Sequence, residues 1–335
     1  MTMQVMSNLI ENLPKTETHL HMEGALPWSL LAKKYPKRFS NIPDFRKEGF
    51  RYDNFEQFES ILIEHAMQWF DSPNSYHEAA KIIFQSHVRQ NVKYVEISFH
   101  AGMIEFLSIP GEEILDAIID AVPDGLEVRV FLGMSRNAYN SFLGPILDQA
   151  LTWDKLSGID LHGLESLPFE SWTIPFWERA RLESKVVKAH AGEFGPASNV
   201  TQAVKELNVR RIQHGTRSID DEEVMKMLVE EGVTLDMCPI SNYKLRVVNS
   251  WKDHPLREFL SRGICCTVST DDPLSFNNSL LDEYEALKTK LGLTNQEIIQ
   301  VVRNGFEVAD LPLQKKDQYL AEIKHLVTES DFYNG

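Results

Sequence analysis

Short runs of apolar and β-branched residues alternate with longer amphipathic segments along most of the chain, and this alternation constrains its fold more than any other feature. Consecutive parallel strands need a crossover connection, usually a helix, so the pattern is typical of a parallel sheet covered by helices. We predict eight strands at the runs Thr16–Met22, Val92–His100, Leu126–Ser135, Gly158–Leu164, Lys185–Ala191, Arg211–His214, Val233–Pro239 and Ile264–Thr270.

The number of strand–helix units favours an α/β fold of the closed (β/α)8, or TIM, barrel type over an open sheet. An open doubly wound sheet is the main alternative, but neither G-x-G-x-x-G nor G-x-x-x-x-G-K-[ST] follows an early predicted strand. No linker rich in Gly or Ser divides the 335 residues. We therefore predict a single barrel domain over residues 1–335.

Two stretches are longer than a minimal barrel needs. Residues 25–76 are rich in aromatic and charged side chains and predict a helical insertion, while residues 275–335 predict C-terminal helices. We expect both to cover the mouth of the barrel, the face on which sites of this fold lie. Elsewhere, capping-box spacings at Ser75–Glu78 and Thr294–Glu297 and the acidic turn Ser218–Asp221 mark predicted helix starts.

The charge balance excludes several kinds of partner. The chain has 34 Lys and Arg against 49 Asp and Glu, a formal net charge of −15 at pH 7, so neither nucleic acid nor an anionic membrane would attract it. No long apolar run predicts a transmembrane helix, and residues 1–14 do not resemble a signal peptide. Three cysteines, Cys238, Cys265 and Cys266, are too few for a disulfide framework. We expect a cytoplasmic protein without nucleic-acid or membrane partners; a homo-oligomer is possible, and the sequence carries no signal for or against it.

Five polar residues stand at the ends of predicted strands. His19 and His21 are two apart on the first strand and point to the same face, because side chains alternate along a strand. His190 and His214 end the fifth and sixth strands, and Asp271 follows the eighth. The strand ends of a parallel barrel converge on its C-terminal face. Three imidazoles and one carboxylate there would suit Zn²⁺ or another divalent first-row metal.

These positions belong to a longer set of motifs that resembles the adenosine/adenine deaminase branch of the amidohydrolases. In chain order the motifs are Pro14–Gly24 (PKTETHLHMEG), Gly158–Gly163 (GIDLHG), His190–Glu193 (HAGE), His214–Gly215 (HG) and Ser269–Pro273 (STDDP). The resemblance implies a metal-dependent hydrolase barrel with one catalytic Zn²⁺ per chain. It also implies hydrolytic loss of ammonia from a small-molecule 6-aminopurine, as in purine salvage.

Carried over position by position, the resemblance implies a zinc site made by His19, His21, His190 and Asp271. Glu193 would protonate ring nitrogen N1, a step that suits a buried carboxylic acid. His214 would orient the zinc-bound water and stabilise charge on the attacking oxygen. Asp272 would hydrogen-bond N7, and the backbone N–H of Gly163 would meet N3. Glu23 and His21 would also lie beside the substrate.

The sequence leaves the substrate open. Many adenosine deaminases have an Asp that meets the ribose 5′-hydroxyl where this chain has Glu23. The segment Cys238–Arg246 (CPISNYKLR) looks closer to adenine-deaminating relatives. We expect adenosine slightly ahead of adenine, with an aminofutalosine-type nucleoside third.

Other function classes fit less well. The fourth predicted strand ends in Asp160-Leu-His-Gly163, without the lysine that bridges two metals in some relatives, which disfavours a two-metal hydrolase of cyclic amides or phosphoesters. Thiolate zinc deaminases use H-x-E and P-C-x-x-C, and neither motif is present. A barrel that binds metal or nucleoside without turnover would lose the acid, but Glu193 and His214 are both present.

Overall fold

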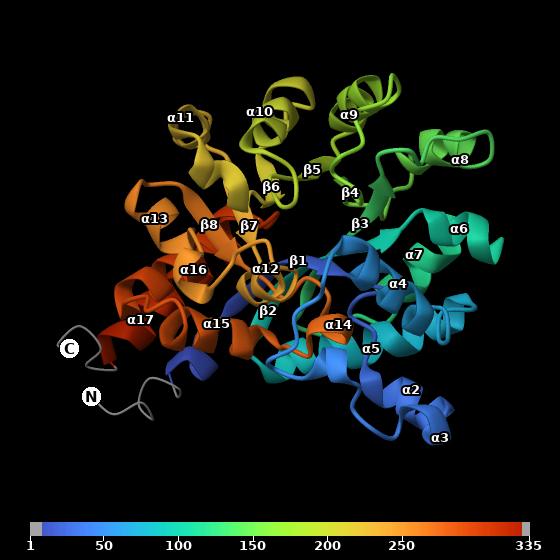
Figure 1. Cartoon of the computed structure of the whole chain (residues 1–335), viewed down its shortest axis with the longest axis horizontal. Helices are drawn as coiled ribbons and strands as arrows, with labels where there is room; N and C mark the ends of the chain where they lie inside the picture. The colour runs from blue at the N-terminus through green and yellow to red at the C-terminus, as the bar shows by residue number, and fades with distance from the viewer. Residues whose placement is uncertain (1–8, 330–335) are drawn as a thin grey trace.

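The alternating segments fold into one parallel sheet of eight strands in the computed structural model, which describes residues 9–329 (Figure 1). The strands follow one another in chain order, and each neighbouring pair is parallel. They are β1 (Lys15–His21), β2 (Val92–His100), β3 (Glu127–Ser135), β4 (Gly158–His162), β5 (Val186–Ala191), β6 (Arg211–His214), β7 (Thr234–Met237) and β8 (Cys265–Val268).

The first and last strands meet and bring the sheet to closure. Leu20 in β1 forms a parallel bridge with Asp271, which follows β8. The N–H of Asp271 donates to the carbonyl of His19, and the N–H of His21 donates to the carbonyl of Asp271. The predicted (β/α)8 barrel is therefore confirmed, and all eight predicted strands are present with ends that differ from prediction by at most two residues.

Helices cover the outside of the barrel and connect consecutive strands (Figure 1). Their apolar residues recur at helical spacing; Val200, Ala203 and Val204, for example, are buried on one side of α10. No helix within residues 9–329 is long and apolar enough to cross a membrane. The connecting helices are α5 (Pro73–Arg89), α6 (Gly102–Leu107), α7 (Gly111–Ile119), α8 (Leu143–Ala150), α9 (Thr173–Leu182), α10 (Ala197–Glu206), η2 (Thr216–Asp220), α11 (Glu222–Glu230), α12 (Pro239–Lys244), η3 (Trp251–Asp253) and α13 (Leu256–Ser261).

Two predicted helix starts are wrong by about one turn. Helix α5 is capped by Ser72, whose capping-box partner is Ser75, so Ser75 lies inside the helix rather than at its start. Pro73 explains the earlier start, because its fixed φ suits the first helical position. The stretch Ser218–Asp221 ends the 3-10 helix η2, and Asp221 caps α11. The box at Thr294–Glu297 forms as predicted.

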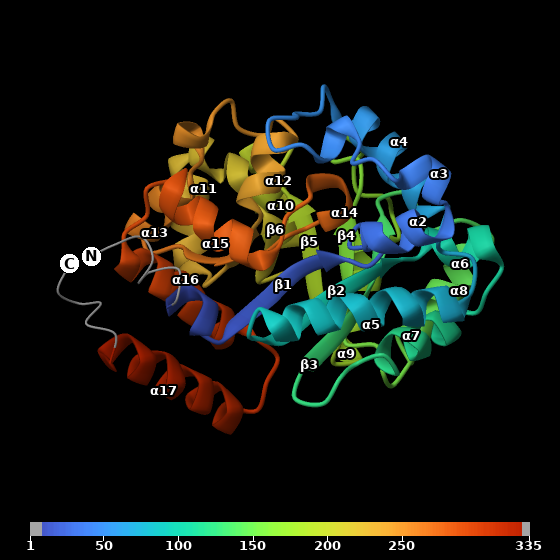
Figure 2. The ribbon, with the colours of Figure 1, turned by 90° about the horizontal axis from the view of Figure 1, so that it is seen from below.

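The insertion contains α2 (Trp28–Lys34), α3 (Pro36–Phe39), η1 (Asp44–Arg46) and α4 (Phe55–Ala66). Figure 2 shows α4 over one end of the barrel and α17 at the opposite end. Phe58 of α4 stacks on Phe276 with ring centroids 5.5 Å apart, and Tyr52 meets both rings edge-on. This aromatic cluster fastens α4 to the segment that follows Asp272, at the mouth of the barrel.

The C-terminal helices are α14 (Pro273–Phe276), α15 (Leu280–Thr289), α16 (Asn295–Val308) and α17 (Leu313–Glu329). None of their described residues lines the cavity at the mouth, although Phe276 of α14 packs there against α4 as expected. Asn304 of α16 instead donates to the carbonyl of Cys266 in β8, and the carbonyl of Val308 accepts from Arg211 at the start of β6. Helix α16 therefore supports the side and the N-terminal end of the barrel, whereas α14 packs against α4 at the mouth.

A buried group of charged residues fills the barrel interior toward the N-terminal ends of the strands. Arg211 donates to both carboxylate oxygens of Asp236 at 2.8–3.0 Å and to Glu96 at 3.1 Å. Lys188 pairs with Glu96 and donates to the carbonyl of Thr18 at 2.7 Å. We call Glu96, Lys188, Arg211 and Asp236 the paired layer. Its two carboxylates and two cations balance, as buried ions must.

Candidate active site

Four potential metal ligands converge at the C-terminal ends of the strands. The structure brings His19 and His21 of β1, His190 of β5 and Asp271 together, with one ligand atom of each within 4.8 Å of the others. His19 Nε2 lies 3.3 Å from His21 Nε2 and 3.1 Å from His190 Nε2. Asp271 Oδ1 lies 3.2 Å from His21 Nε2 and 3.4 Å from His19 Nε2. This is the neighbourhood that the sequence predicts.

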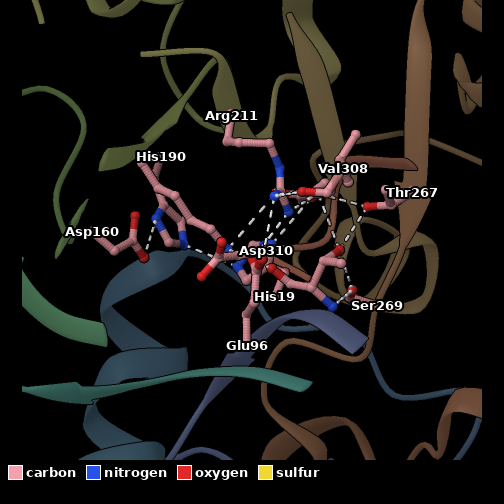
Figure 3. Close-up of polar contacts among 12 residues, drawn as sticks. His19, Glu96, Asp160, His190, Arg211, Thr267, Ser269, Val308 and Asp310 are labelled. Atoms are coloured by element: carbon pink, nitrogen blue, oxygen red, sulfur yellow. Dashed lines mark hydrogen bonds and ion pairs between the residues drawn. The ribbon is translucent and has the colours of Figure 1, made fainter. Parts of the chain in front are cut away.

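Hydrogen bonds on the far side of two rings decide where their protons lie. His19 Nδ1 is 3.1 Å from the carbonyl of Asp236, and His190 Nδ1 is 3.1 Å from the carbonyl of Leu161 and 3.3 Å from Asp160 Oδ2 (Figure 3). Because these oxygens can only accept, both Nδ1 atoms carry the hydrogen and both Nε2 atoms present lone pairs. The Nε2 atoms of His19 and His190 are 3.1 Å apart, so their lone pairs repel each other unless a cation lies between them. The donor set therefore fits a divalent metal, with outer partners of the usual kind.

The surrounding carboxylates also favour a positive charge among the three imidazoles. Burial alone lowers the pKa of His21, but Asp272 and Asp271 outweigh that effect and raise the pKa to about 9. Asp271 is oriented by Ser241, whose hydroxyl donates to its Oδ2 at 2.7 Å, so that Oδ1 faces His19 and His21. We call the three imidazoles and the nearby carboxyl groups the site layer. Its members are His19, His21, His190, Glu193, Asp271 and Asp272.

Glu193 lies on the loop after β5, and another carboxylate holds that loop. Glu165 accepts from four consecutive backbone N–H groups, those of Gly192 at 2.5 Å, Glu193 and Phe194 at 3.0 Å, and Gly195 at 2.8 Å. A Cβ on Gly195 would lie 2.3 Å from Asn199 Nδ2 and 2.7 Å from the carboxylate of Glu165, so a side chain there would displace these groups. Burial, reinforced by Asp271 and Glu165, raises the pKa of Glu193 well above its usual value, which favours the protonated acid.

Asp272 points its carboxyl group into the same space. Its Oδ1 is buried and has no hydrogen-bond partner within residues 9–329. Burial and the neighbouring Asp271 raise the pKa of Asp272 well above its usual value. A Cβ at position 24 would lie 1.5 Å from Oδ1, so Gly24 makes room for this group. A protonated Asp272 can donate to an acceptor nitrogen of a ligand.

All members of the site layer except His19 line one cavity of about 440 Å³ at the mouth of the barrel. Helix α4 forms an apolar wall with Phe55, Phe58 and Leu62, and Gly163, with φ +82°, also lines the cavity. None of the described residues that line the cavity is Lys or Arg. The cavity therefore suits a neutral, partly apolar ligand.

Glu23 and two further histidines occupy one end of the cavity. The carboxylate of Glu23 accepts from the hydroxyl of Tyr76 at 2.8 Å and from the backbone N–H of His100 at 3.2 Å. His100 Nδ1 and His162 Nε2 are 3.2 Å apart, and both rings line the cavity. The two rings therefore form part of the pocket wall.

Several residues of the site's surroundings were not identified from the sequence as parts of it. Ser241 orients Asp271, and Glu165 holds the loop of Glu193. Asn242 contacts His214 directly, and His254 contacts Asn242. The signal for Glu165 was its place two residues after Gly163, beside a motif already singled out. The others follow β7, where sequence spacing shows no regular pattern.

Comparison with known proteins gives a consistent result. A sequence profile of the adenosine deaminase family matches residues 14–326. An adenine deaminase from Crocosphaera subtropica is 31% identical over 333 residues, which cover 93% of this chain and 99% of that protein.

Solved structures agree with the fold. The crystal structure of an adenine deaminase from Arthrobacter aurescens has a TM-score of 0.83 at 26% identity and covers 94% of this chain and 99% of that one. An amidohydrolase from Burkholderia ambifaria with bound zinc has the same TM-score at 22% identity, covers 98% of this chain and 96% of that one, and shares the fold.

Proposed function

Since this chain belongs to the adenosine deaminase family, we propose that it hydrolyses a 6-aminopurine to the 6-oxopurine and ammonia, with adenine as its substrate. Membership of the family makes it a hydrolase that acts on C–N bonds. The observation that carries the proposal is that three of the four clustered metal donors, His21, His190 and Asp271, line one cavity together with Glu193 and the buried Asp272.

His19, His21, His190 and Asp271 would hold one Zn²⁺ per chain. Three neutral nitrogens and one carboxylate are a ligand set that Zn²⁺ accepts. When bound, the ion supplies Lewis acidity, which makes hydroxide available at neutral pH. The protein supplies the converging lone pairs and the hydrogen bonds from Nδ1 that orient two of the rings.

The remaining groups account for the bonds that change. The water oxygen bonds to C6 while Glu193 gives its proton to N1, so that the ring can accept the nucleophile. The C6–N bond then breaks with its electron pair on nitrogen. One proton of the water replaces the one lost by Glu193, and the other leaves with the amino group as ammonia. Asp272 would donate to N7, and the N–H of Gly163 would meet N3.

Adenine is preferred to adenosine for two reasons, which reverses the order expected from the sequence. The relative at 31% identity and the structural neighbour at 26% identity are both adenine deaminases. Moreover, Glu23, the residue that would meet a ribose, already accepts from Tyr76 and His100. Adenosine is the second candidate, because the cavity of about 440 Å³ is also lined by the apolar side chains of α4, which a larger ligand would contact.

Nucleotides are disfavoured by charge. The cavity lining includes the carboxyl groups of Glu23, Glu59, Glu193, Asp271 and Asp272, and among its described residues there is no Lys or Arg. A phosphate in this cavity would lose water without gaining a cationic partner.

The test is ammonia release by the zinc-loaded protein with adenine, adenosine, 2′-deoxyadenosine and AMP, at equal protein and metal content. We expect the highest kcat/KM with adenine and no turnover of AMP. The matched control is Glu193→Gln loaded in the same way, which should retain zinc and lose turnover. Higher kcat/KM with adenosine would overturn the substrate, and no turnover of any 6-aminopurine would overturn the deaminase proposal in favour of a silent binding barrel.

A further inference from the structure

His214 faces the reacting groups with one nitrogen and a chain of buried polar residues with the other. It is the last residue of β6, is 1% exposed and has φ +63°. Its Nε2 lies 3.6 Å from Glu193 Oε1 and 3.8 Å from Asp271 Oδ2, so it points into the space where the attacking oxygen must sit. Which of its nitrogens carries the proton therefore decides what it can do there.

The other nitrogen, Nδ1, is 3.1 Å from the side-chain amide of Asn242 on α12. The opposite atom of that amide is 3.2 Å from His254 Nε2, and the hydroxyl of Thr216 lies at the same distance. His254 Nδ1 in turn is 3.3 Å from the backbone nitrogen of Leu256. His214, Asn242 and His254 thus form a buried chain that ends on a backbone amide.

That backbone amide sets the direction of every hydrogen bond in the chain. The N–H of Leu256 can only donate, so His254 Nδ1 must accept and its proton lies on Nε2. Burial lowers the pKa of His254 to about 3, which keeps the ring neutral with a single proton. Nε2–H then donates to the amide oxygen of Asn242, and the amide nitrogen is left to donate to His214 Nδ1.

We propose that Asn242 and His254 are positioning residues that hold the proton of His214 on Nε2, so that His214 meets the attacking oxygen as a hydrogen-bond donor and does not act as a general base. A ring nitrogen that accepts from an amide cannot carry a proton itself, and Nε2 has no lone pair left for a proton from water. The direction set at Leu256 is thereby transmitted to the reaction centre. The catalytic consequence rests on the proposed function, whereas the position of the proton does not.

Nitrogen-15 NMR of the histidine-labelled full-length protein reads that position directly, without substrate. Long-range proton–nitrogen correlations distinguish a protonated ring nitrogen from an unprotonated one, and the His214→Asn variant identifies the signal. We expect His214 to be protonated on Nε2 only, in both the metal-free and the zinc-loaded protein. A proton on Nδ1 of His214 in the wild type would overturn the proposal, whatever the activity proves to be.

The substitution Asn242→Asp reverses the last hydrogen bond with almost no change in shape. A carboxylate can only accept, so Nδ1 of His214 should gain a proton in this variant, and kcat should fall about 10²-fold with little change in KM, as for loss of one donor to a reacting oxygen. Asn304→Asp is the matched control, because Asn304 is also buried but donates to Cys266 far from the cavity. It should leave the His214 signal and kcat unchanged. An unaltered His214 signal in Asn242→Asp would contradict the proposal.

Position 254 provides a second test that does not require Asn242→Asp to fold. His254→Leu removes the donor that orients the amide and should lower kcat about 10-fold, with a mixture of His214 proton positions. His254→Gln can still donate to the oxygen of Asn242 and should restore both kcat and the single proton position. Equal effects of the two substitutions would mean that His254 only fills space.

Discussion

The interior of the barrel contains two layers of buried ionisable side chains, and the layers differ in whether opposite charges are paired. In the paired layer each carboxylate faces a cation. Asp236 accepts from Arg211 through both of its oxygens, and Glu96 pairs with both Arg211 and Lys188. In the site layer imidazole faces imidazole and carboxyl group faces carboxyl group. The Nε2 atoms of His19 and His190, for example, are 3.1 Å apart.

The difference explains why only the site layer is a candidate for binding a metal and a substrate. A balanced set of ions needs nothing from outside, whereas converging lone pairs and carboxylates favour a cation and protons. The layers are also connected, since the carbonyl of Asp236 accepts from His19 and the hydroxyl of Thr18 donates to Asp236 at 3.0 Å. The paired layer therefore orients a ligand of the site layer without contributing one.

The largest expected effect on activity comes from removing Asp271, the carboxylate among the four candidate metal ligands. Asp271→Ala should abolish metal binding, and because a catalytic metal supplies several kcal/mol, turnover should fall by at least about 10³-fold. The measurement is metal content per chain after gel filtration, together with ammonia release. Asp317→Ala, at an exposed position on α17, is the control and should retain both. Full metal content in Asp271→Ala would show that the ligand is another residue.

A substitution in the paired layer should lower the stability of the fold. Arg211→Met removes the guanidinium that donates to both oxygens of Asp236. It should lower the free energy of unfolding by about 3–5 kcal/mol, the cost of breaking a buried ion pair. Arg262→Met removes an exposed arginine that pairs with Glu222 and Glu258, and we expect a loss of at most about 1 kcal/mol. Urea denaturation of both variants measures the contrast. Similar losses would mean that the paired layer is no more important than surface pairs.

A smaller effect is expected from the proton donor. Glu193→Gln keeps the four metal donors and the shape of the cavity, so it should retain metal while kcat falls by at least about 10²-fold, as for loss of a general acid. Metal analysis and kcat on the same preparation separate this outcome from that of Asp271→Ala. Near-normal turnover would rule out Glu193 as the acid.

The smallest expected effect is at Glu165, which acts through the loop of Glu193. An amide has one accepting oxygen in place of two, so Glu165→Gln should free part of Gly192–Gly195 and lower kcat by about 10-fold through a misplaced acid. Hydrogen exchange of these backbone amides should rise at the same time. Glu112→Gln, an exposed change on α7, is the control. Unchanged exchange in Glu165→Gln would argue against this role.

Much of the fold and the centre of the site was predictable. Period-two spacing placed His19 and His21 on one face, and strand ends placed His190, His214 and Asp271 near them. The helix start at Ser75 was wrong because the serine three residues earlier, followed by proline, competes for the same capping role. The expected cover from the C-terminal helices holds for α14, which packs against α4, but not for α16, which packs along β8 and β1 instead.

The sequence by itself determined the barrel and the set of side chains at its mouth, because strand periodicity and parallel topology depend on local spacing alone. Only the tertiary structure decided how those groups are hydrogen-bonded. The proton of His19 is directed by a carbonyl 217 residues away, and the loop of Glu193 is held by a carboxylate 28 residues earlier. Hydrogen-bond direction depends on which donor meets which acceptor in space, and spacing along the chain does not contain that information.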